Sequence, residues 1–255
     1  MKSASLAEPY IREVADWHIF DANVRVGPSG VHGELALEAN ALLSEMDRFG
    51  IERALVSHWA AEEYDALEGN RRLEAIGQDE RLVAAWAALP DKNSLEALAA
   101  LQPRAVRLHF AVHKHNFSPA VWCSGELYAY LQDHRVLTLV ALEDIGWNGL
   151  VEVLRNFPRL RLVLLETGYR ADRYLFPLLQ RFPNLYFDTS TYVAHRQLES
   201  FVERFGSERV VLGSRLPLYT PGAVLTVLAT ARIQDADRLN IAGQNLRRLL
   251  DGGPA

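Results

Sequence analysis

Three features are scarce in this 255-residue sequence: cysteine, long apolar runs and clustered positive charge. The single cysteine, Cys123, cannot form an intramolecular disulfide, which fits a reducing compartment. No run approaches the roughly 20 apolar residues that a membrane-spanning helix needs, and the N-terminus lacks the apolar core of a secretion signal. The formal net charge of -5 comes with no basic stripe. These absences predict a cytoplasmic protein with neither nucleic-acid nor membrane partners.

Several familiar catalytic and nucleotide-binding motifs are also missing. The sequence contains no Gly-x-Ser-x-Gly elbow, so a serine hydrolase has no support. The glycine-rich turn at 27–30 matches neither the spacing of a P-loop nor that of a dinucleotide-binding fingerprint. Any function must therefore come from other side chains.

The composition that is present suits one globular domain. Apolar residues make up 49% and charged residues 23% of the chain, which is ordinary for a protein with a full core. The length matches that of a single α/β barrel. We predict an N-terminal extension at 1–16, a barrel at 17–250 and a short tail at 251–255.

Eight short apolar runs alternate with longer segments of helical periodicity. Parallel strands joined by helices give this pattern, and eight repeats favour a closed (β/α)₈ (TIM) barrel with an eight-stranded parallel sheet over an open sheet. The expected strands begin near His18, Ala54, Leu82, Val106, Leu137, Leu162, Leu185 and Val210.

The segments between the runs carry signals of helix packing and helix ends. Leu42, Met46 and Phe49 are spaced three or four apart, as a helix that packs on a barrel wall requires. Gly50 and Gly206 sit where helix C-caps are expected. In two other segments between a helix and the next strand, Pro158 and Pro183 stand where the helix is expected to end.

The stretches 20–27, 43–51, 64–73, 209–217 and 241–249 resemble the amidohydrolase-related family. The resemblance covers nearly the whole chain. It implies a (β/α)₈ barrel and the chemistry of metal-dependent hydrolases and decarboxylases. It also implies a divalent metal such as zinc, held by histidines and an aspartate at the carboxyl ends of the strands.

This sequence departs from the family pattern at each ligand position that can be aligned. Asn23 and Arg25 replace the His-x-His of the first strand, Glu166 replaces a histidine after the sixth, and Arg215 replaces the aspartate after the eighth. Around the fifth strand no histidine is present, and Glu143 follows its end. A guanidinium has no lone pair to donate to a metal. We therefore expect no cofactor.

The replacements predict an ion-paired cluster at the barrel mouth, in which Glu166 and Glu143 balance Arg25 and Arg215. One interpretation is that the cluster only stabilises the top of the barrel. The other is that the two arginines stay partly unpaired and bind the carboxylate or phosphate of a small ligand. A closed Arg25–Glu166 pair with no cavity beside it would exclude this second interpretation.

Two histidines at predicted strand ends, His58 and His109, are candidates for general acid or base catalysis, although single histidines are more often structural. Trp86 lies at another strand end and is a candidate wall for an aromatic ligand; packing between rim and helices explains it equally well. His113 and His115 flank Lys114, and we interpret this segment as an exposed polar loop.

Two functions remain open. The first is a hydrolase or decarboxylase acting on a small, anionic or aromatic compound, with His109, Glu166 and His58 in catalysis. Its ligand contacts would be Asn23, Arg25, Glu143, Trp86 and Arg215. The second is a metal-free, non-catalytic barrel that binds a metabolite or a partner protein. The sequence leaves the oligomeric state open.

Overall fold

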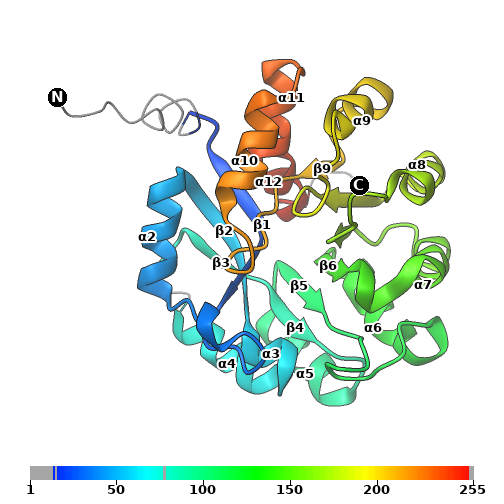
Figure 1. Cartoon of the computed structure of the whole chain (residues 1–255). Helices are drawn as coiled ribbons and strands as arrows, with labels where there is room; N and C mark the ends of the chain where they lie inside the picture. The colour runs from blue at the N-terminus through cyan, green and yellow to red at the C-terminus, as the bar shows by residue number, and fades with distance from the viewer. Residues whose placement is uncertain (1–13, 15, 77–78, 253–255) are drawn as a thin grey trace.

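Parallel strands form the centre of the molecule and helices surround them (Figure 1). This computed structural model describes residues 14, 16–76 and 79–252. The parallel pairing of its strands confirms the predicted α/β barrel. The predicted extension at 1–16 and the tail at 251–255 fall largely outside the described residues.

In the described part of the chain, nine strands fill eight positions around the barrel. The third position is shared, because β3 pairs only with β2 and β4 pairs only with β5, while the amide of Ala85 between them donates to the carbonyl of Val56 on β2. The strands are β1 (Ile19–Val26), β2 (Ile51–His58), β3 (Leu82–Ala84), β4 (Trp86–Ala88), β5 (Ala105–Leu108), β6 (Leu137–Ala141), β7 (Leu162–Leu165), β8 (Leu185–Asp188) and β9 (Val210–Val211).

The segment that begins with β9 closes the barrel against β1. The amide of Ala22 donates to the carbonyl of Leu212 at 2.8 Å, and that of Arg25 donates to the carbonyl of Leu216 at 2.9 Å. A parallel bridge also joins Val24 to Leu216. The eighth predicted strand is therefore shorter than its apolar run, but its continuation still pairs with the first.

The helices begin and end largely where the sequence signals fall. Gly50 caps α2 in the left-handed region at φ 68°, and Gly206 caps α9 at φ 74°. The helical segments are η1 (Gly33–Leu35), α2 (Ala39–Phe49), α3 (Trp59–Glu63), α4 (Ala66–Ile76), α5 (Lys92–Leu101), α6 (Val121–Asp133), α7 (Leu142–Asn156), α8 (Asp172–Arg181), α9 (Gln197–Phe205), α10 (Pro221–Thr230), α11 (Asp235–Leu239), η2 (Asn240–Gln244) and α12 (Asn245–Leu250).

Two apolar layers hold the barrel together. The larger layer contains strand residues such as Leu162 and Leu164 together with the buried faces of the helices. The smaller layer contains the alternate strand residues, such as Val163 and Leu165, and fills the barrel interior. Leucines of α12 join this inner layer, and the Arg161 side chain, just before β7, donates to the carbonyl of Leu249. Helix α12 therefore lies at the amino ends of the strands and leaves their carboxyl ends free for a site.

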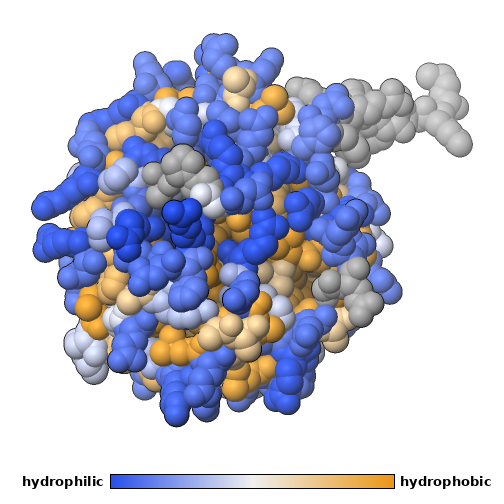
Figure 2. Space-filling model, turned by 180° about the vertical axis from the view of Figure 1, so that it is seen from behind, coloured by the Kyte–Doolittle hydropathy of each residue, from blue (hydrophilic) through white to orange (hydrophobic). Residues whose placement is uncertain are grey.

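The surface carries both hydrophilic and apolar side chains. Seen from behind, hydrophilic side chains cover most of this face and apolar residues form small patches between them (Figure 2). None of the helices in the described part of the chain has the length and apolar character that crossing a membrane requires.

Close packing of α4 on α3 gives a stability prediction. A Cβ added at Gly69 would lie 2.2 Å from the backbone nitrogen of Ala61, so Gly69→Ala requires backbone movement. We expect a loss of about 1–3 kcal/mol in the free energy of unfolding, measured with urea. Gly125→Ala on α6 is the control, because its added Cβ meets only a side-chain atom at 3.3 Å. The control is expected to be neutral or stabilising. Equal effects of the two substitutions would contradict the tight contact.

Candidate active site

Charged side chains and one amide side chain meet at the carboxyl ends of the strands. Asn23 and Arg25 lie on β1, Arg107 on β5, Glu166 directly after β7 and Arg215 a few residues after β9. All barrel strands are parallel and end at one face, so residues far apart in the sequence converge there. Except for Arg215, whose side chain is 24% exposed, these side chains are almost completely buried.

Glu166 is the centre of this cluster. Its Oε1 accepts hydrogen bonds from Nη2 of Arg25 at 3.0 Å, from Nη2 of Arg107 at 3.2 Å and from Nδ2 of Asn23 at 3.3 Å. Its Oε2 lies 2.8 Å from Nη2 of Arg215. Three guanidinium groups therefore share one carboxylate. The predicted pairing of Arg25 and Arg215 with Glu166 is present, and Arg107 joins it.

The backbone at two of these positions adopts an unusual conformation. Glu166 has φ 59° and Arg215 has φ 63°, in the left-handed region that few residues other than glycine adopt. The amide of Glu166 is held by a hydrogen bond to Oδ1 of Asp188 at 2.9 Å. Such strain costs about 1–3 kcal/mol per residue and is concentrated at functional sites.

A second buried carboxylate, Glu62 at the end of α3, completes the network. Its Oε2 accepts from Nε of Arg25 at 2.7 Å, and its Oε1 lies 3.1 Å from Nζ of Lys114. The guanidinium of Arg25 also lies 5.0 Å from the centre of the Trp59 ring. Nη1 of Arg25 donates to Oδ1 of Asn23, so all three guanidinium nitrogens of Arg25 have partners within the protein.

These contacts fix the charge states. Burial alone would raise the pKa of Glu166, but Arg25, Arg107 and Arg215 lower it to about 2. Burial also opposes ionisation of Glu62, and the same kind of cationic neighbours, Arg25 first, bring its pKa well below the ordinary value. Both carboxylates are therefore ionised near neutral pH, and neither is an effective proton acceptor there.

Lys114 corrects the expectation of an exposed loop. Its side chain is only 4% exposed, and Nζ lies 2.8 Å from both Glu143 and Asp144 in addition to its contact with Glu62. His113 beside it is exposed as expected, whereas Nε2 of His115 lies 2.7 Å from the carbonyl oxygen of Ala61. Three carboxylates draw the lysine inward, which the polar character of the segment alone did not indicate.

The two candidate histidines lie in different surroundings. His109 is fully buried, with Nδ1 4.0 Å from Glu62, and neither ring nitrogen has a hydrogen-bond partner in the described part of the chain. Burial lowers its pKa well below the ordinary value, so the ring is neutral. His58 caps α3, because its Nδ1 accepts from the amide of Ala60 at 3.0 Å. Burial lowers its pKa as well.

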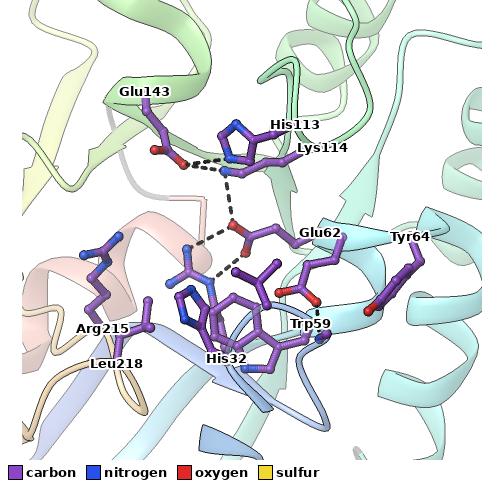
Figure 3. A pocket seen from close by; sticks show the side chains of 13 residues that line it. His32, Trp59, Glu62, Tyr64, His113, Lys114, Glu143, Arg215 and Leu218 are labelled. Carbon is purple, nitrogen blue, oxygen red and sulfur yellow. Dashed lines mark hydrogen bonds and ion pairs between the residues drawn. The ribbon is translucent and has the colours of Figure 1, made fainter. Parts of the chain in front are cut away.

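A cavity of about 300 Å³ opens beside the network. Figure 3 shows Arg215 and Glu143 on one side of it and Tyr64 on the opposite side, with His32 and Trp59 between them. The closed Arg25–Glu166 pair therefore has a cavity next to it, so the binding interpretation is not excluded. The donors of Arg25 are engaged within the network, which leaves Arg215 as the partly exposed guanidinium.

Two other predicted contacts are placed differently from the expectation. Glu143 lies in the first turn of α7 and contacts Lys114, not Arg25 or Arg215. Trp86 does not line this cavity, whereas Trp59 does.

A second, mostly apolar cavity of about 390 Å³ is lined by other residues of the segment that carries Arg215. Its lining includes Ser214 and Tyr219, and Nη1 of Arg215 donates to the Tyr219 hydroxyl at 3.1 Å. The first cavity is the stronger candidate site because the charged groups of the strand ends line it.

The donor set does not fit a divalent metal. Two guanidinium groups and an amide, those of Arg25, Arg215 and Asn23, stand where the family pattern has metal ligands, and a guanidinium repels a cation. Within residues 14, 16–76 and 79–252, no group of three or more His, Cys, Asp or Glu side chains is arranged to hold a metal ion. These side chains therefore do not match the metal that the family resemblance implies.

Sequence reasoning missed three members of the network: Glu62, Arg107 and Lys114. Arg107 had a usable signal, because it shares a strand face with His109 inside an otherwise apolar run. Glu62 gave no such signal, since it lies in a five-residue helix whose polar residues resemble an ordinary exposed turn.

Comparison with known proteins places these residues in a family. The model of a family described as amidohydrolase matches residues 34–252. No curated protein matches the sequence.

Solved structures share the fold. An uncharacterised TIM-barrel protein from Bordetella bronchiseptica has a TM-score of 0.75 at 17% identity, covering 92% of this chain and 98% of that one. A 5-carboxyvanillate decarboxylase from Novosphingobium aromaticivorans, with bound manganese and a nitrobenzoic acid, has a TM-score of 0.73 at 10% identity, covering 93% and 98%. A 2,6-dihydroxybenzoate decarboxylase from Rhizobium has a TM-score of 0.69 at 15% identity, covering 91% and 98%. At these identities the likeness establishes the fold alone.

The buried network gives a prediction about stability. Arg25→Met leaves Glu62 and Glu166 each without one buried partner, so we expect a loss of about 3–5 kcal/mol in the free energy of unfolding. Arg48→Met removes an exposed pair with Glu45 and serves as control, with an expected loss below about 1 kcal/mol. Urea unfolding of both variants checks this. Similar losses would mean that Arg25 does not hold the two carboxylates.

A buried aspartate near the network gives a pH-dependent prediction. Oδ1 of Asp21 accepts from the amides of Asn23 and Ser214, while Oδ2 has no partner among the described residues. Burial raises the pKa of Asp21 from 3.8 to about 6, with nearby Asp188 adding to the effect. A raised folded-state pKa gives stability that is present below pH 3.8 and is lost as the pH rises through about 6.

Asp21→Asn keeps the acceptor oxygen and removes the charge. We expect the variant to be more stable than the parent by about 2–3 kcal/mol at pH 8 and to show no gain near pH 4. Urea unfolding at the two pH values measures this difference. Asp133→Asn, at an exposed ion pair, is the control and should show little change at either pH. A gain that is equal at both pH values contradicts the raised pKa.

Proposed function

The chain belongs to the amidohydrolase family, and we propose that it acts on a small carboxylate-bearing compound without a divalent metal, as a hydrolase or decarboxylase. The observation that carries this proposal is the position of Arg25 and Arg215 beside an open cavity at the carboxyl ends of the strands. In barrels of this kind the active site lies at that face. Fixed guanidinium charge supplies there what a metal ion supplies in other members.

Arg215 is the group that meets the ligand carboxylate. It lines the cavity, and its contacts with Glu166 and Tyr219 use only two of its five N–H donors. Its charge is only partly balanced, because Glu166 is shared with Arg25 and Arg107. A carboxylate can therefore form charge-assisted hydrogen bonds to Arg215 while the buried network stays intact.

The aromatic part of the cavity wall suits the planar or apolar body of a ligand. The ring centres of His32 and Trp59 lie 5.6 Å apart, and Tyr64 completes the wall. Aromatic side chains of this kind bind the apolar part of small ligands. The neighbouring Lys114 stays protonated, because Glu62 and Asp144 outweigh its burial and raise its pKa. In the hydrolase form of this proposal Lys114 stabilises the negative charge that develops on the substrate oxygen, and the half-exposed Glu143 accepts the proton that the attacking water loses.

His109, Glu166 and His58 take different places in this proposal. Glu166 positions the three arginines, since its low pKa makes it a poor base. His109 stays a candidate base behind Glu62, because both of its ring nitrogens lack partners in the described residues. His58 holds the start of α3, the helix that carries Glu62.

A non-catalytic binding barrel is the second candidate. It is favoured by the pairing of the buried charges, which keeps the pKa values of Glu62 and Glu166 low and makes both poor bases. Release of carbon dioxide or of a hydrolysis product from a panel of aromatic acids, amides and lactones distinguishes the two. Ligand binding without turnover across the panel would favour the non-catalytic barrel.

The proposal predicts binding that depends on Arg215 and not on metal. Calorimetry with 3-phenylpropanoate as the probe should give the same affinity before and after chelator treatment. Arg215→Gln should weaken it at least about tenfold, as expected for loss of hydrogen bonds to a charged group. Elemental analysis of protein purified without added metal or chelator should find no stoichiometric zinc or manganese.

Arg196→Gln, at the start of α9 and away from this cavity, is the matched control and should leave affinity unchanged. Stoichiometric metal, or binding that is lost on chelation, would overturn the metal-independent proposal. Binding that is unaffected by Arg215→Gln would place the carboxylate elsewhere.

A further inference from the structure

The polar cavity carries a net negative charge, which disfavours a purely anionic ligand relative to one that also carries a positive charge. Its lining holds three cations, Arg25, Lys114 and Arg215, and three carboxylates, Glu62, Glu63 and Glu143. The side chains directly behind them add one cation, Arg107, and two carboxylates, Glu166 and Asp144. Among the described residues that line this cavity or lie directly behind its lining, there are therefore four cations and five carboxylates. The negative charge of an anionic ligand would add to this excess of one carboxylate.

Two of the carboxylates are poorly compensated. Lys114 is the nearest cation to Glu143, at 2.8 Å, but its single charge is shared with Glu62 and Asp144. Nε2 of His113 lies farther away, at 3.9 Å from Glu143, and adds a positive charge only when the ring is protonated. Glu63 has no cationic partner in the described part of the chain and accepts only from neutral donors, the hydroxyl of Ser29 at 2.6 Å and the amide of Gly30 at 2.7 Å. Each carboxylate oxygen has more than one lone pair, so both groups can accept further hydrogen bonds.

We propose that the ligand is a zwitterion whose carboxylate meets Arg215 and whose ammonium group meets Glu143, with its apolar body against Trp59 and Tyr64. Arg215 and Glu143 line one cavity of about 300 Å³, so a small molecule bound in it has both groups in its surroundings. The aromatic wall also favours a cation, because ring faces attract positive charge. This inference rests on the proposed function, since it takes Arg215 as the carboxylate contact.

The charges of this cavity favour a zwitterion over a carboxylic acid that carries no positive group. A ligand with one charge of each sign adds no net charge to the site and gives both Arg215 and Glu143 a partner. A simple aromatic acid has no cationic group to add to the contact that Glu143 already makes with Lys114. An α-amino acid or a related aminocarboxylate is therefore the substrate class that the described charges recognise.

Three probes with the same ring separate the two charges. Phenylalanine is the zwitterion, 3-phenylpropanoate lacks the ammonium group, and 2-phenylethylamine lacks the carboxylate. In calorimetry on the full chain we expect phenylalanine to bind at least about tenfold more tightly than either single-charge probe. Equal or weaker binding of phenylalanine, while 3-phenylpropanoate still binds through Arg215, overturns this inference and leaves the proposed function standing.

Paired variants test which residue meets which charge. Glu143→Gln keeps an acceptor oxygen for Lys114 and should weaken phenylalanine and 2-phenylethylamine about tenfold, with no loss for 3-phenylpropanoate. Arg215→Gln should weaken phenylalanine and 3-phenylpropanoate but not 2-phenylethylamine. Glu126→Gln on α6, outside the cavity, is the control and should change none of the three.

The pattern of losses decides between the outcomes. If Glu143→Gln weakens all three probes equally, the residue acts through the structure of the site and the ammonium contact is wrong. If none of the probes binds in a manner that depends on Arg215, the proposed function itself fails. Circular dichroism and thermal unfolding of each variant show that the comparison is made on folded protein.

Discussion

The ion pair between Glu166 and three guanidinium groups is the constraint on which the mouth of this barrel depends. It joins side chains carried by β1 and β5 and by the segments that follow β7 and β9, so it ties together strands that are far apart in the sequence. Ions buried this deeply are tolerated only when each has a partner, and removing one leaves the others costly. The left-handed backbone at Glu166 and Arg215 belongs to the same constraint, because it aims both side chains at one point.

The fold could be predicted from the sequence because strand and helix periodicity are local signals. Eight apolar runs and the caps at Gly50 and Gly206 indicate the barrel without any knowledge of contacts. The split of the third strand into β3 and β4 was not indicated, since the run around Ala85 is continuous in sequence. The backbone there changes partners between β2 and β5, which only the tertiary arrangement decides.

The site could be predicted only where a family pattern marked the position. Arg25, Glu166 and Arg215 stand at positions where such a pattern expects metal ligands, so their chemistry was conspicuous. Glu62 and Lys114 lie on a short helix and a loop, where charged residues are ordinary. Their burial results from mutual attraction across the mouth, a long-range effect with no local sequence signal. Glu143 was correctly placed at a strand end, but its partner is Lys114, because α7 begins there and turns the side chain toward the neighbouring loop.

Arginines at positions where the family pattern expects metal ligands offer a ligand a different kind of positive charge. A divalent ion is a point charge that accepts oxygen ligands from several directions, whereas a guanidinium offers directed N–H donors in one plane. Here four of the five N–H donors of Arg25 point to Glu62, Glu166 and Asn23, so the charge of that arginine is largely neutralised before any ligand arrives. Structural likeness to decarboxylases of aromatic acids therefore does not determine the charge of the ligand that this chain binds. In our proposal the balance among the side chains of this chain determines that charge, and the excess of carboxylates is what a ligand with charges of both signs would tolerate.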